Sequence, residues 1–314
     1  MILDPDAQRV LDMMKAAGRP AFDSLSPKEA RGFFSGGRAV LQPDPPEVAQ
    51  VRELSAPASG GPVPLRLYRA IGTSPQAVLP VLIYFHGGGW VLGDLDSHDQ
   101  VCRTIANAAG CCVIAVDYRL APEAKFPGPI DDAAEATRWI LAQAADLAID
   151  PDRVAVGGDS AGGNIAAVMA LMARDAELPK IAFQLLIYPV TDMGKGFGSY
   201  QRVTQGYPLV ASTMTWFIDH YLRSHADVAD WRASPLRAAS LAGTAPALVL
   251  TCKHDPLCDE GVEYAHRLDR DRVPVTHLHF NDQMHGFLTM GRIIRASDTA
   301  ISMVSLAMRR AWNA

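Results

Sequence analysis

The fold of this chain is indicated most clearly by residues 154–167, which read VAVGGDSAGGNIAA. The first residues are apolar or small, as in a buried strand, and the last five suit the start of a helix. Between them, Gly158, Ser160 and Gly162 form the pattern G-x-S-x-G, whose small residues let a strand and a helix approach closely. At such a turn the serine takes a strained backbone conformation. We therefore predict a strand, a sharp turn and a helix, with Ser160 as a candidate nucleophile.

Apolar runs on both sides of this stretch predict further buried strands of a parallel sheet, at 78–85, 112–116, 183–188, 247–251 and 275–280. Helical patterns alternate with these runs, at 97–109, 130–147, 162–178, 261–270 and 293–312. This alternation predicts an α/β fold, in which a mostly parallel twisted sheet carries helices on both faces. Upstream, Glu47–Leu54 and Val63–Arg69 alternate apolar and polar residues around the turn SGGP, which predicts a hairpin.

Two segments interrupt the rhythm of strands and helices. Residues 1–45 contain two short helical patterns, Ala7–Ala17 and Ser26–Phe34, and Ser26 with Glu29 forms a capping box at the start of the second. The connection from Pro189 to Pro246 is too long for one crossover helix, and it contains two helical patterns, at 211–222 and 230–239. Because long connections in compact domains are usually functional, we predict an inserted lid.

A glycine triplet supplies the second chemical signal. The sequence HGGGW at 86–90 directly follows the strand predicted at 78–85. Three glycines free the backbone so that its N–H groups can point into a cavity, where they stabilise the oxyanion formed during acyl transfer. A phosphate loop would need Lys-Ser/Thr after the glycines, and a dinucleotide site would need G-x-G-x-x-G opening a helix. Neither is present, so the triplet predicts an oxyanion hole.

An acid and a histidine should follow the nucleophile in the order Ser, Asp or Glu, His. His285 lies in the loop after the last predicted strand, at the carboxyl end of the sheet and level with Ser160. Asp255 follows the strand predicted at 247–251, and loops at this end build the sites of open α/β sheets. Asp282 is the main competitor for the acid and Glu260 a weaker one. We favour Asp255, with His285 as the base.

Composition limits the other classes of function. The chain has 314 residues, 49% of them hydrophobic, and a net charge of −5 without a block of Lys or Arg that would suggest nucleic acid or an anionic membrane. No apolar run reaches the roughly 18–20 residues of a membrane span. The acidic, proline-broken start lacks the features of a signal peptide, so we expect a cytoplasmic protein.

Cysteine usage argues against a disulfide framework and against zinc. The count is five, which is odd, and no secretory segment accompanies it. Cys252, His254 and Cys258 lie close in sequence but lack the paired spacing of structural zinc modules. We therefore expect no metal and no cofactor.

Five motifs in order resemble the bacterial hormone-sensitive-lipase family of esterases, in the family IV branch named for the pentapeptide GDSAG. They are HGGGW at 86–90, DYRLAPE at 117–123, GDSAGGN at 158–164, DPLCDEG at 255–261 and HGF at 285–287. The match covers nearly the whole chain. It departs at Gln283-Met284, where family members often carry glycine or another small residue, and we expect this to alter the pocket wall and not the mechanism.

The resemblance implies an α/β-hydrolase fold with a helical cap. Residues 1–45 would form the first part of the cap and 191–237 its inserted part, while 46–190 and 238–314 would form the core. The oxyanion donors would be the N–H groups of Gly88, Gly89 and Ala161. Substrates would be esters of short to medium acyl chains, and the loop at 117–123 would be structural.

The expected chemistry is ester hydrolysis through an acyl-enzyme, with Asp255 fixing the tautomer of His285 and His285 accepting the proton of Ser160. If Trp90 bounds the acyl pocket, truncating it to alanine should favour longer acyl chains. The large apolar residues that we expect near the site are Phe34, Trp90, Tyr188, Met214, Phe217, Leu257, Met284 and Phe287.

Several alternatives stay open. The same residues could hydrolyse amides, as an amidase or deacetylase. A non-catalytic binding member of the fold would lose the histidine, which is present here as His285, and a dehydrogenase is contradicted by the missing dinucleotide fingerprint. The expected partner is a small-molecule ester, with neither nucleic acid nor membrane. The chain could be a monomer or a homodimer that pairs through the edge strand near Val275–Phe280.

Overall fold

The computed structural model describes residues 2–194 and 196–313. Within them, eight strands form one sheet in the order β1-β2-β4-β3-β5-β6-β7-β8. The first two strands pair as the predicted antiparallel hairpin, β2 is antiparallel to β4, and the remaining pairs are parallel. This confirms the mostly parallel sheet. The bounds are β1 Gln50–Ala56, β2 Val63–Arg69, β3 Leu79–Phe85, β4 Cys112–Val116, β5 Ile149–Asp159, β6 Phe183–Ile187, β7 Ala247–His254 and β8 Val275–Met284.

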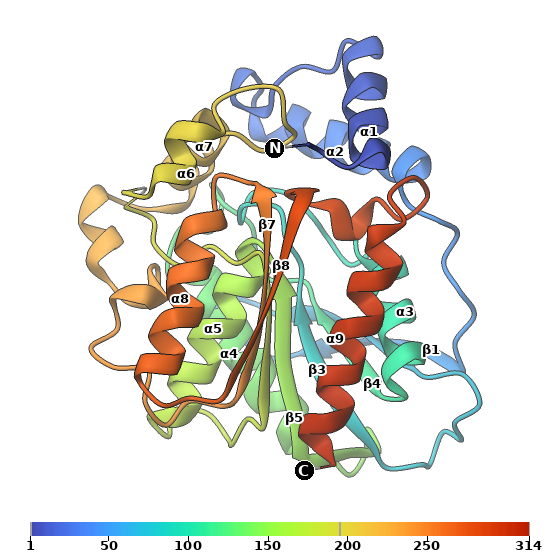
Figure 1. Ribbon diagram of the computed structural model, residues 1–314. Helices are drawn as coiled ribbons and strands as arrows, with labels where there is room; N and C mark the ends of the chain where they lie inside the picture. Colours follow the sequence, from blue (N-terminus) through green and yellow to red (C-terminus); the bar gives the residue numbers. More distant parts are fainter. Residues whose placement is uncertain (1, 195, 314) are drawn as a thin grey trace.

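Helices cover both faces of the sheet (Figure 1). In β3, the side chains of Val81, Ile83 and Phe85 enter the core on one side, and those of Leu82 and Tyr84 enter the core on the other. A strand buried on both faces needs apolar residues at every position, which explains its unbroken apolar run. The first core lies under α4 Gly128–Ala142, α5 Ala161–Arg174 and α8 Cys258–Arg270, and the second under α3 Asp99–Ala109 and α9 Ala296–Trp312.

The N-terminal segment lies over the carboxyl ends of the strands (Figure 1, blue). Asp4 starts its first helix, because its carboxylate accepts the N–H groups of Asp6 and Ala7. The predicted capping box is present: Ser26 donates its N–H to the Glu29 carboxylate at 3.0 Å, and the Glu29 N–H reaches Ser26 Oγ at 3.4 Å. The segment contains α1 Pro5–Ala16, the short helix η1 Phe22–Ser24 and α2 Pro27–Leu41.

An arginine on α2 fastens this segment to the core. Arg31 donates to the carbonyl oxygens of Val91 at 2.8 Å and Ala121 at 2.9 Å. Its guanidinium also pairs with Glu123 at 2.7 Å. These partners lie in loops that leave β3 and β4, so α2 is held against the edge of the sheet where Ser160 lies.

The long connection between β6 and β7 has two parts. Its helices α6 Gly198–Arg202 and α7 Ala211–Tyr221 lie over the same edge of the sheet, and α7 contacts η1 of the N-terminal segment (Figure 1, yellow). The chain then passes through the short helices η2 His225–Ala229 and η3 Pro235–Arg237 and descends beside α5 and α8.

The prediction of a helix at 230–239 in this connection is wrong. Only the three residues of η3 are helical there. The Asp230 carboxylate accepts the N–H of Arg232 at 2.9 Å, and Ser234 Oγ accepts the N–H of Met193 at 3.1 Å. The Asp230 bond is local, whereas the Ser234 bond reaches a residue 41 positions earlier. Neither is a helical bond, and Pro235 lacks the N–H that a continuing helix would use.

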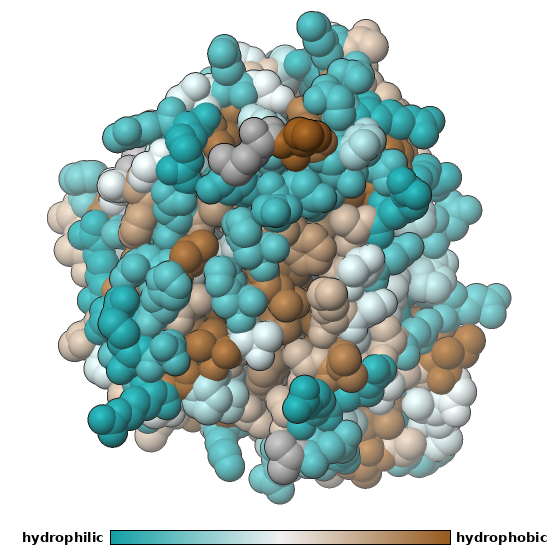
Figure 2. Space-filling view, in the orientation of Figure 1, coloured by the Kyte–Doolittle hydropathy of each residue, from teal (hydrophilic) through white to brown (hydrophobic). Residues whose placement is uncertain are grey.

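The surface is mainly hydrophilic, with apolar side chains gathered in the middle of one face, over β8 between α8 and α9 (Figure 2). β8 is an edge strand of the sheet. Within residues 2–194 and 196–313, no helix has both the length and the apolar character needed to cross a bilayer. All five cysteines are buried free thiols.

Candidate active site

Ser160 occupies a tight turn between β5 and α5, as the sequence predicts. Its backbone angles are φ 57° and ψ −117°, a conformation that non-glycine residues rarely adopt. A Cβ atom on either Gly158 or Gly162 would collide with the carbonyl oxygen of Phe85 on the neighbouring strand. The flanking glycines therefore let β3 pass directly beside the turn, which holds the serine at the carboxyl edge of the sheet.

A continuous chain of hydrogen bonds joins Ser160, His285 and Asp255. His285 Nε2 lies 2.9 Å from Ser160 Oγ, and its Nδ1 lies 2.7 Å from Asp255 Oδ2. Asp255 is fully buried, and its other oxygen accepts the N–H of Leu257 at 2.8 Å, which fixes the carboxylate. Because a carboxylate only accepts, the Nδ1 of His285 carries the hydrogen and Nε2 faces the serine hydroxyl. This arrangement can remove the proton of Ser160.

Neither competing acid is hydrogen-bonded to His285 in the described structure. Glu260 accepts the N–H of Thr191 at 2.7 Å and the hydroxyl of Tyr200 at 3.0 Å, and burial raises its pKa well above the ordinary range. It therefore ties the start of the β6–β7 connection to α8. No hydrogen bond or ion pair joins the Asp282 side chain to His285 in the described structure. The acid beside His285 is Asp255.

The glycine triplet forms a loop that faces the same cavity as Ser160. Gly88 and Gly89 have φ values of 122° and 61° and line this cavity. The N–H groups of Gly88, Gly89 and Ala161 donate to no acceptor among the residues that the structure describes. Backbone donors left free beside a nucleophile can stabilise an oxyanion.

A buried polar network behind this loop was not foreseen from the sequence. The carboxylate of Asp159 accepts the hydroxyl of Tyr84 at 2.8 Å and the N–H of Gly87 at 3.0 Å, and His98 Nε2 lies 3.1 Å from it. Burial acts to raise the pKa of Asp159, but the charge of His98 and the hydrogen bonds of His98 and Tyr84 hold it below its ordinary value. The available signal was an acidic residue within an otherwise small, apolar motif. Asp159 thus ties the glycine loop to β5.

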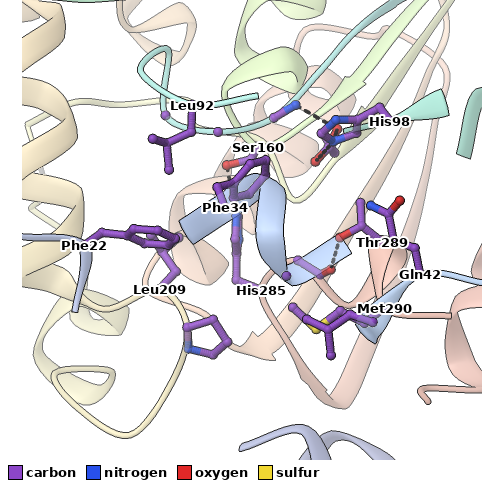
Figure 3. Close-up of a pocket in the computed structure, with 18 of the residues that line it drawn as sticks. Phe22, Phe34, Gln42, Leu92, His98, Ser160, Leu209, His285, Thr289 and Met290 are labelled. Carbon is purple, nitrogen blue, oxygen red and sulfur yellow. Dashed lines mark hydrogen bonds and ion pairs between the residues drawn. The ribbon is translucent and has the colours of Figure 1, made fainter. Parts of the chain in front are cut away.

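The cavity beside Ser160 has a volume of about 120 Å³ and is lined mainly by apolar side chains. Two of the predicted pocket residues, Phe34 and Phe217, line it. Figure 3 shows Phe22 and Leu209 to the left of Ser160 and His285 and Met290 to the right, with Phe34 overlapping Ser160 and His285 in this view. Sequence reasoning missed Phe22, Leu209 and Met290. The first two lie on the irregular segments that cover the site, where no periodic pattern indicates which side chains face the cavity.

The other six predicted pocket residues do not line this cavity. Each is almost completely buried in one of the two cores, where its side chain packs against neighbouring elements. The ring of Trp90 stacks on Tyr221 at 4.3 Å, and the ring of Tyr188 supports His285 from 4.6 Å. The expectation of a pocket wall is therefore corrected for Trp90, Tyr188, Met214, Leu257, Met284 and Phe287.

Comparisons with known proteins agree with this geometry. The model of a family described as alpha/beta hydrolase fold matches residues 82–289. The chain is 40% identical over 317 residues to an ethyl acetate hydrolase of Pseudomonas putida, which covers 99% of both proteins. It is also 40% identical over 259 residues to the carboxylesterase NlhH of Mycobacterium tuberculosis, covering 80% of this chain and 79% of that protein.

Solved structures give the same result. An ester-hydrolase from the metagenome of Lake Arreo, complexed with a derivative of bipyridine phosphonate, superposes with a TM-score of 0.95 at 40% identity and full coverage of both chains. A hyperthermophilic esterase from Pyrobaculum calidifontis superposes with a TM-score of 0.92 at 36% identity, covering 99% of each chain. The chain belongs to the α/β-hydrolase family, in the branch of esterases related to hormone-sensitive lipase.

Proposed function

We propose that this carboxylic ester hydrolase cleaves esters of short to medium acyl chains, with Ser160 as nucleophile, His285 as base and Asp255 as the residue that orients the histidine. The observation that carries the proposal is the hydrogen-bonded chain from Asp255 through His285 to Ser160, beside three unpaired backbone N–H groups within the described residues. The names of the relatives, among them ethyl acetate hydrolase and carboxylesterase, support the same reaction.

The reaction proceeds in two halves. Ser160 Oγ bonds to the ester carbonyl carbon while its proton moves to His285 Nε2, and the carbonyl oxygen becomes an oxyanion that accepts hydrogen bonds from Gly88, Gly89 and Ala161. The oxyanion collapses, the C–O bond to the alcohol breaks, and His285 gives its proton to the leaving oxygen. A water then attacks the acyl-enzyme, again with His285 as base, which releases the acid and restores the Ser160 hydroxyl.

The covering segments support the proposed range of acyl chains. Pockets for drug-sized ligands measure about 300–1,000 Å³, so a cavity of about 120 Å³ favours small groups. Its walls come from residues 1–45, through Phe34, and from residues 191–237, through Leu209 and Phe217. We propose that these two segments form a cap over a core made of 46–190 and 238–314.

The experiment is hydrolysis of p-nitrophenyl esters from acetate to octanoate, read as kcat/KM. The Ser160→Ala variant should lose activity by a factor of about 10⁴–10⁶, as in other enzymes with this constellation. Equal rates for the wild type and Ser160→Ala would overturn the serine mechanism. A p-nitroanilide with the same acyl group distinguishes an esterase from an amidase that uses the same residues.

We also propose that the protein works on a small-molecule ester in the cytoplasm, as a monomer or as a homodimer that pairs through β8. Five buried free thiols suit a reducing compartment, and β8 is an edge strand. Light scattering after size-exclusion chromatography gives the oligomeric state. The variants Pro274→Asp and Val275→Lys each place a charge at the start of this strand. Either should weaken a β8 dimer and leave a monomer unchanged.

A further inference from the structure

Arg19, in the N-terminal segment, lines the cavity that contains Ser160. Arg19 follows the end of α1, where Gly18 adopts φ 61°. The Gly18 N–H donates to the carbonyl of Lys15 at 3.1 Å, and the Arg19 N–H donates to that of Met14 at 3.2 Å. This pair of bonds is the Schellman arrangement that closes many helices, and it fixes the backbone at Arg19. The arginine is thus placed by the end of a helix and not by a free loop.

The guanidinium of Arg19 lacks a counter-charge. It is half-buried and lies 4.9 Å from the ring centroid of Phe22. Among the described residues, no carboxylate pairs with it and no side-chain or backbone oxygen accepts a hydrogen bond from it. Partial burial lowers its pKa from the ordinary value. A cation removed from water without a partner is costly, so a ligand that supplied negative charge would be stabilised there.

Other arginines show what a satisfied guanidinium looks like in this chain. Arg31 pairs with Glu123 at 2.7 Å, and Arg202 pairs with Asp259. Arg69, which is fully buried, instead donates to main-chain carbonyl oxygens such as that of Ser74. Arg19 has neither kind of partner in the described structure.

Arg19 also lies between two hollows. It lines the active-site cavity of about 120 Å³ together with Ser160, and it lines the adjoining groove of about 870 Å³ between α1 and residues 205–213. Met14, Phe22 and Pro208 line both hollows with it. The groove and the cavity therefore adjoin at these shared residues, and the cavity that contains Ser160 is also lined by the apolar rings of Phe22 and Phe34, both labelled in Figure 3.

We propose that Arg19 binds a carboxylate carried by the ester at the end remote from the scissile bond, so that preferred substrates are esters with a second, ionised acid group. This proposal rests on the esterase function assigned to Ser160 and deepens it. The apolar stem of such a substrate would lie against Phe22 and Phe34, and its carboxylate would accept two parallel N–H bonds from the guanidinium.

The charged groups around the groove leave this role to Arg19. Asp12 lies on α1 and accepts a hydrogen bond from the Gln8 amide at 2.9 Å, and Lys15 lines the same groove. Neither residue lines the cavity that contains Ser160. The histidine of the groove, His254, is hydrogen-bonded to the Tyr207 hydroxyl at 2.8 Å. Arg19 is the cation that a carboxylate would meet on leaving the apolar cavity.

The test compares esters that differ only in one charge. On the acyl side, mono-p-nitrophenyl glutarate is compared with its neutral methyl ester. On the alcohol side, 4-acetoxybenzoate is compared with methyl 4-acetoxybenzoate. The quantity measured is the ratio of kcat/KM for the charged ester to that for the neutral ester, after subtraction of the Ser160→Ala rate.

In one of the two arms, Arg19→Gln should lower this ratio by about 10- to 100-fold, as expected for loss of a hydrogen-bonded charge pair. Arg19→Lys should retain part of it, because the charge remains but the two-pronged geometry is lost. The matched control is Arg9→Gln, which changes an exposed arginine on α1 that lines neither hollow, and its ratio should equal that of the wild type.

The arm in which the ratio falls identifies the side of the ester that carries the carboxylate. If the ratio is the same for the wild type and Arg19→Gln in both arms, the proposal is overturned while the esterase function stands. If the wild type and Ser160→Ala hydrolyse the neutral esters equally fast, the esterase function itself fails. Thermal unfolding of each variant checks that its fold is intact.

Discussion

The carboxylate of Asp159 should control both the stability of the core and the position of the glycine loop. It is 4% exposed and accepts from Tyr84 and Gly87, at the end of β3 and in the loop after it, and it lies beside His98. Substitution Asp159→Ala removes the acceptor and leaves these donors buried without a partner. The consequence should appear in two separate measurements, the free energy of unfolding and kcat.

The expected size follows from the contacts. An unsatisfied buried polar group costs about 1–3 kcal/mol, and breaking a buried ion pair costs about 3–5 kcal/mol. Because the three donors share one carboxylate, their costs are not additive, and we expect Asp159→Ala to lose about 3–5 kcal/mol of stability. The Gly87 N–H bond holds the residue before Gly88, and a displaced oxyanion donor lowers kcat by about 10²- to 10³-fold.

The assay combines denaturant unfolding with p-nitrophenyl acetate kinetics at a temperature where the variant is fully folded. Asp159→Asn is the matched control, since its amide oxygen can still accept from Gly87 and Tyr84. It should lose stability, because its N–H faces His98, yet keep kcat within about 10-fold of the wild type. If Asp159→Ala is folded and has the kcat of the wild type, the carboxylate does not position the glycine loop.

The same carboxylate gives a dependence on pH. The pKa of Asp159 in the folded protein lies below its ordinary value of 3.8. A depressed acid contributes stability above its unfolded pKa and loses that contribution as the pH falls through the folded value. The stability difference between the wild type and Asp159→Asn should therefore be largest near neutral pH and shrink below about pH 4.

Three further outcomes follow from individual contacts. Gly89→Ala should lower kcat for p-nitrophenyl acetate by about 100-fold or more, because the new Cβ would collide with the Phe217 ring and the residue has φ 61°; a wild-type kcat would contradict this. Burial first, and neighbouring carboxylates second, raise the pKa of Asp117 to about 6. Folding therefore favours the neutral form of Asp117, and the contribution of this carboxyl to the free energy of unfolding is lost as the pH rises through about 6. The substitution Asp117→Asn should stabilise the protein by about 1–2 kcal/mol at about pH 8 and not at about pH 4, as measured by denaturant unfolding. Trp90→Ala should cost about 3–5 kcal/mol through loss of packing on Tyr221 and leave the acyl-chain profile unchanged; a changed profile at unchanged stability would show that the ring bounds the pocket after all.

Local patterns were enough to predict most of the core. The strand runs came from residues buried on both faces, and 112–116 matches β4 without a shift at either end. The capping box at Ser26 and Glu29 was readable because a helix start is set by residues three positions apart. The helix at 230–239 failed because Ser234 is bonded to Met193, which lies 41 positions earlier and leaves no trace in the local pattern.

The residues of the pocket show the same limit of local sequence patterns. Trp90 and Phe217 look equally suited to a pocket wall in the sequence, since both are large and apolar. Their positions differ because the ring of Trp90 turns toward Tyr221, whereas Phe217 lines the cavity with Ser160. Phe22 was missed because it lies on a three-residue helix whose orientation depends on contacts with α7.

The sequence by itself determined the fold class, the turn at Ser160 and the order of the residues that meet there, because parallel strands bring their carboxyl ends to one edge wherever the loops lie along the chain. Only the tertiary structure decided which acid holds His285, that Asp159 anchors the glycine loop, and that Arg19 opens onto the cavity without a counter-charge. Those features depend on distances between segments far apart in the sequence, and such distances are set by packing of the whole chain and not by any local pattern.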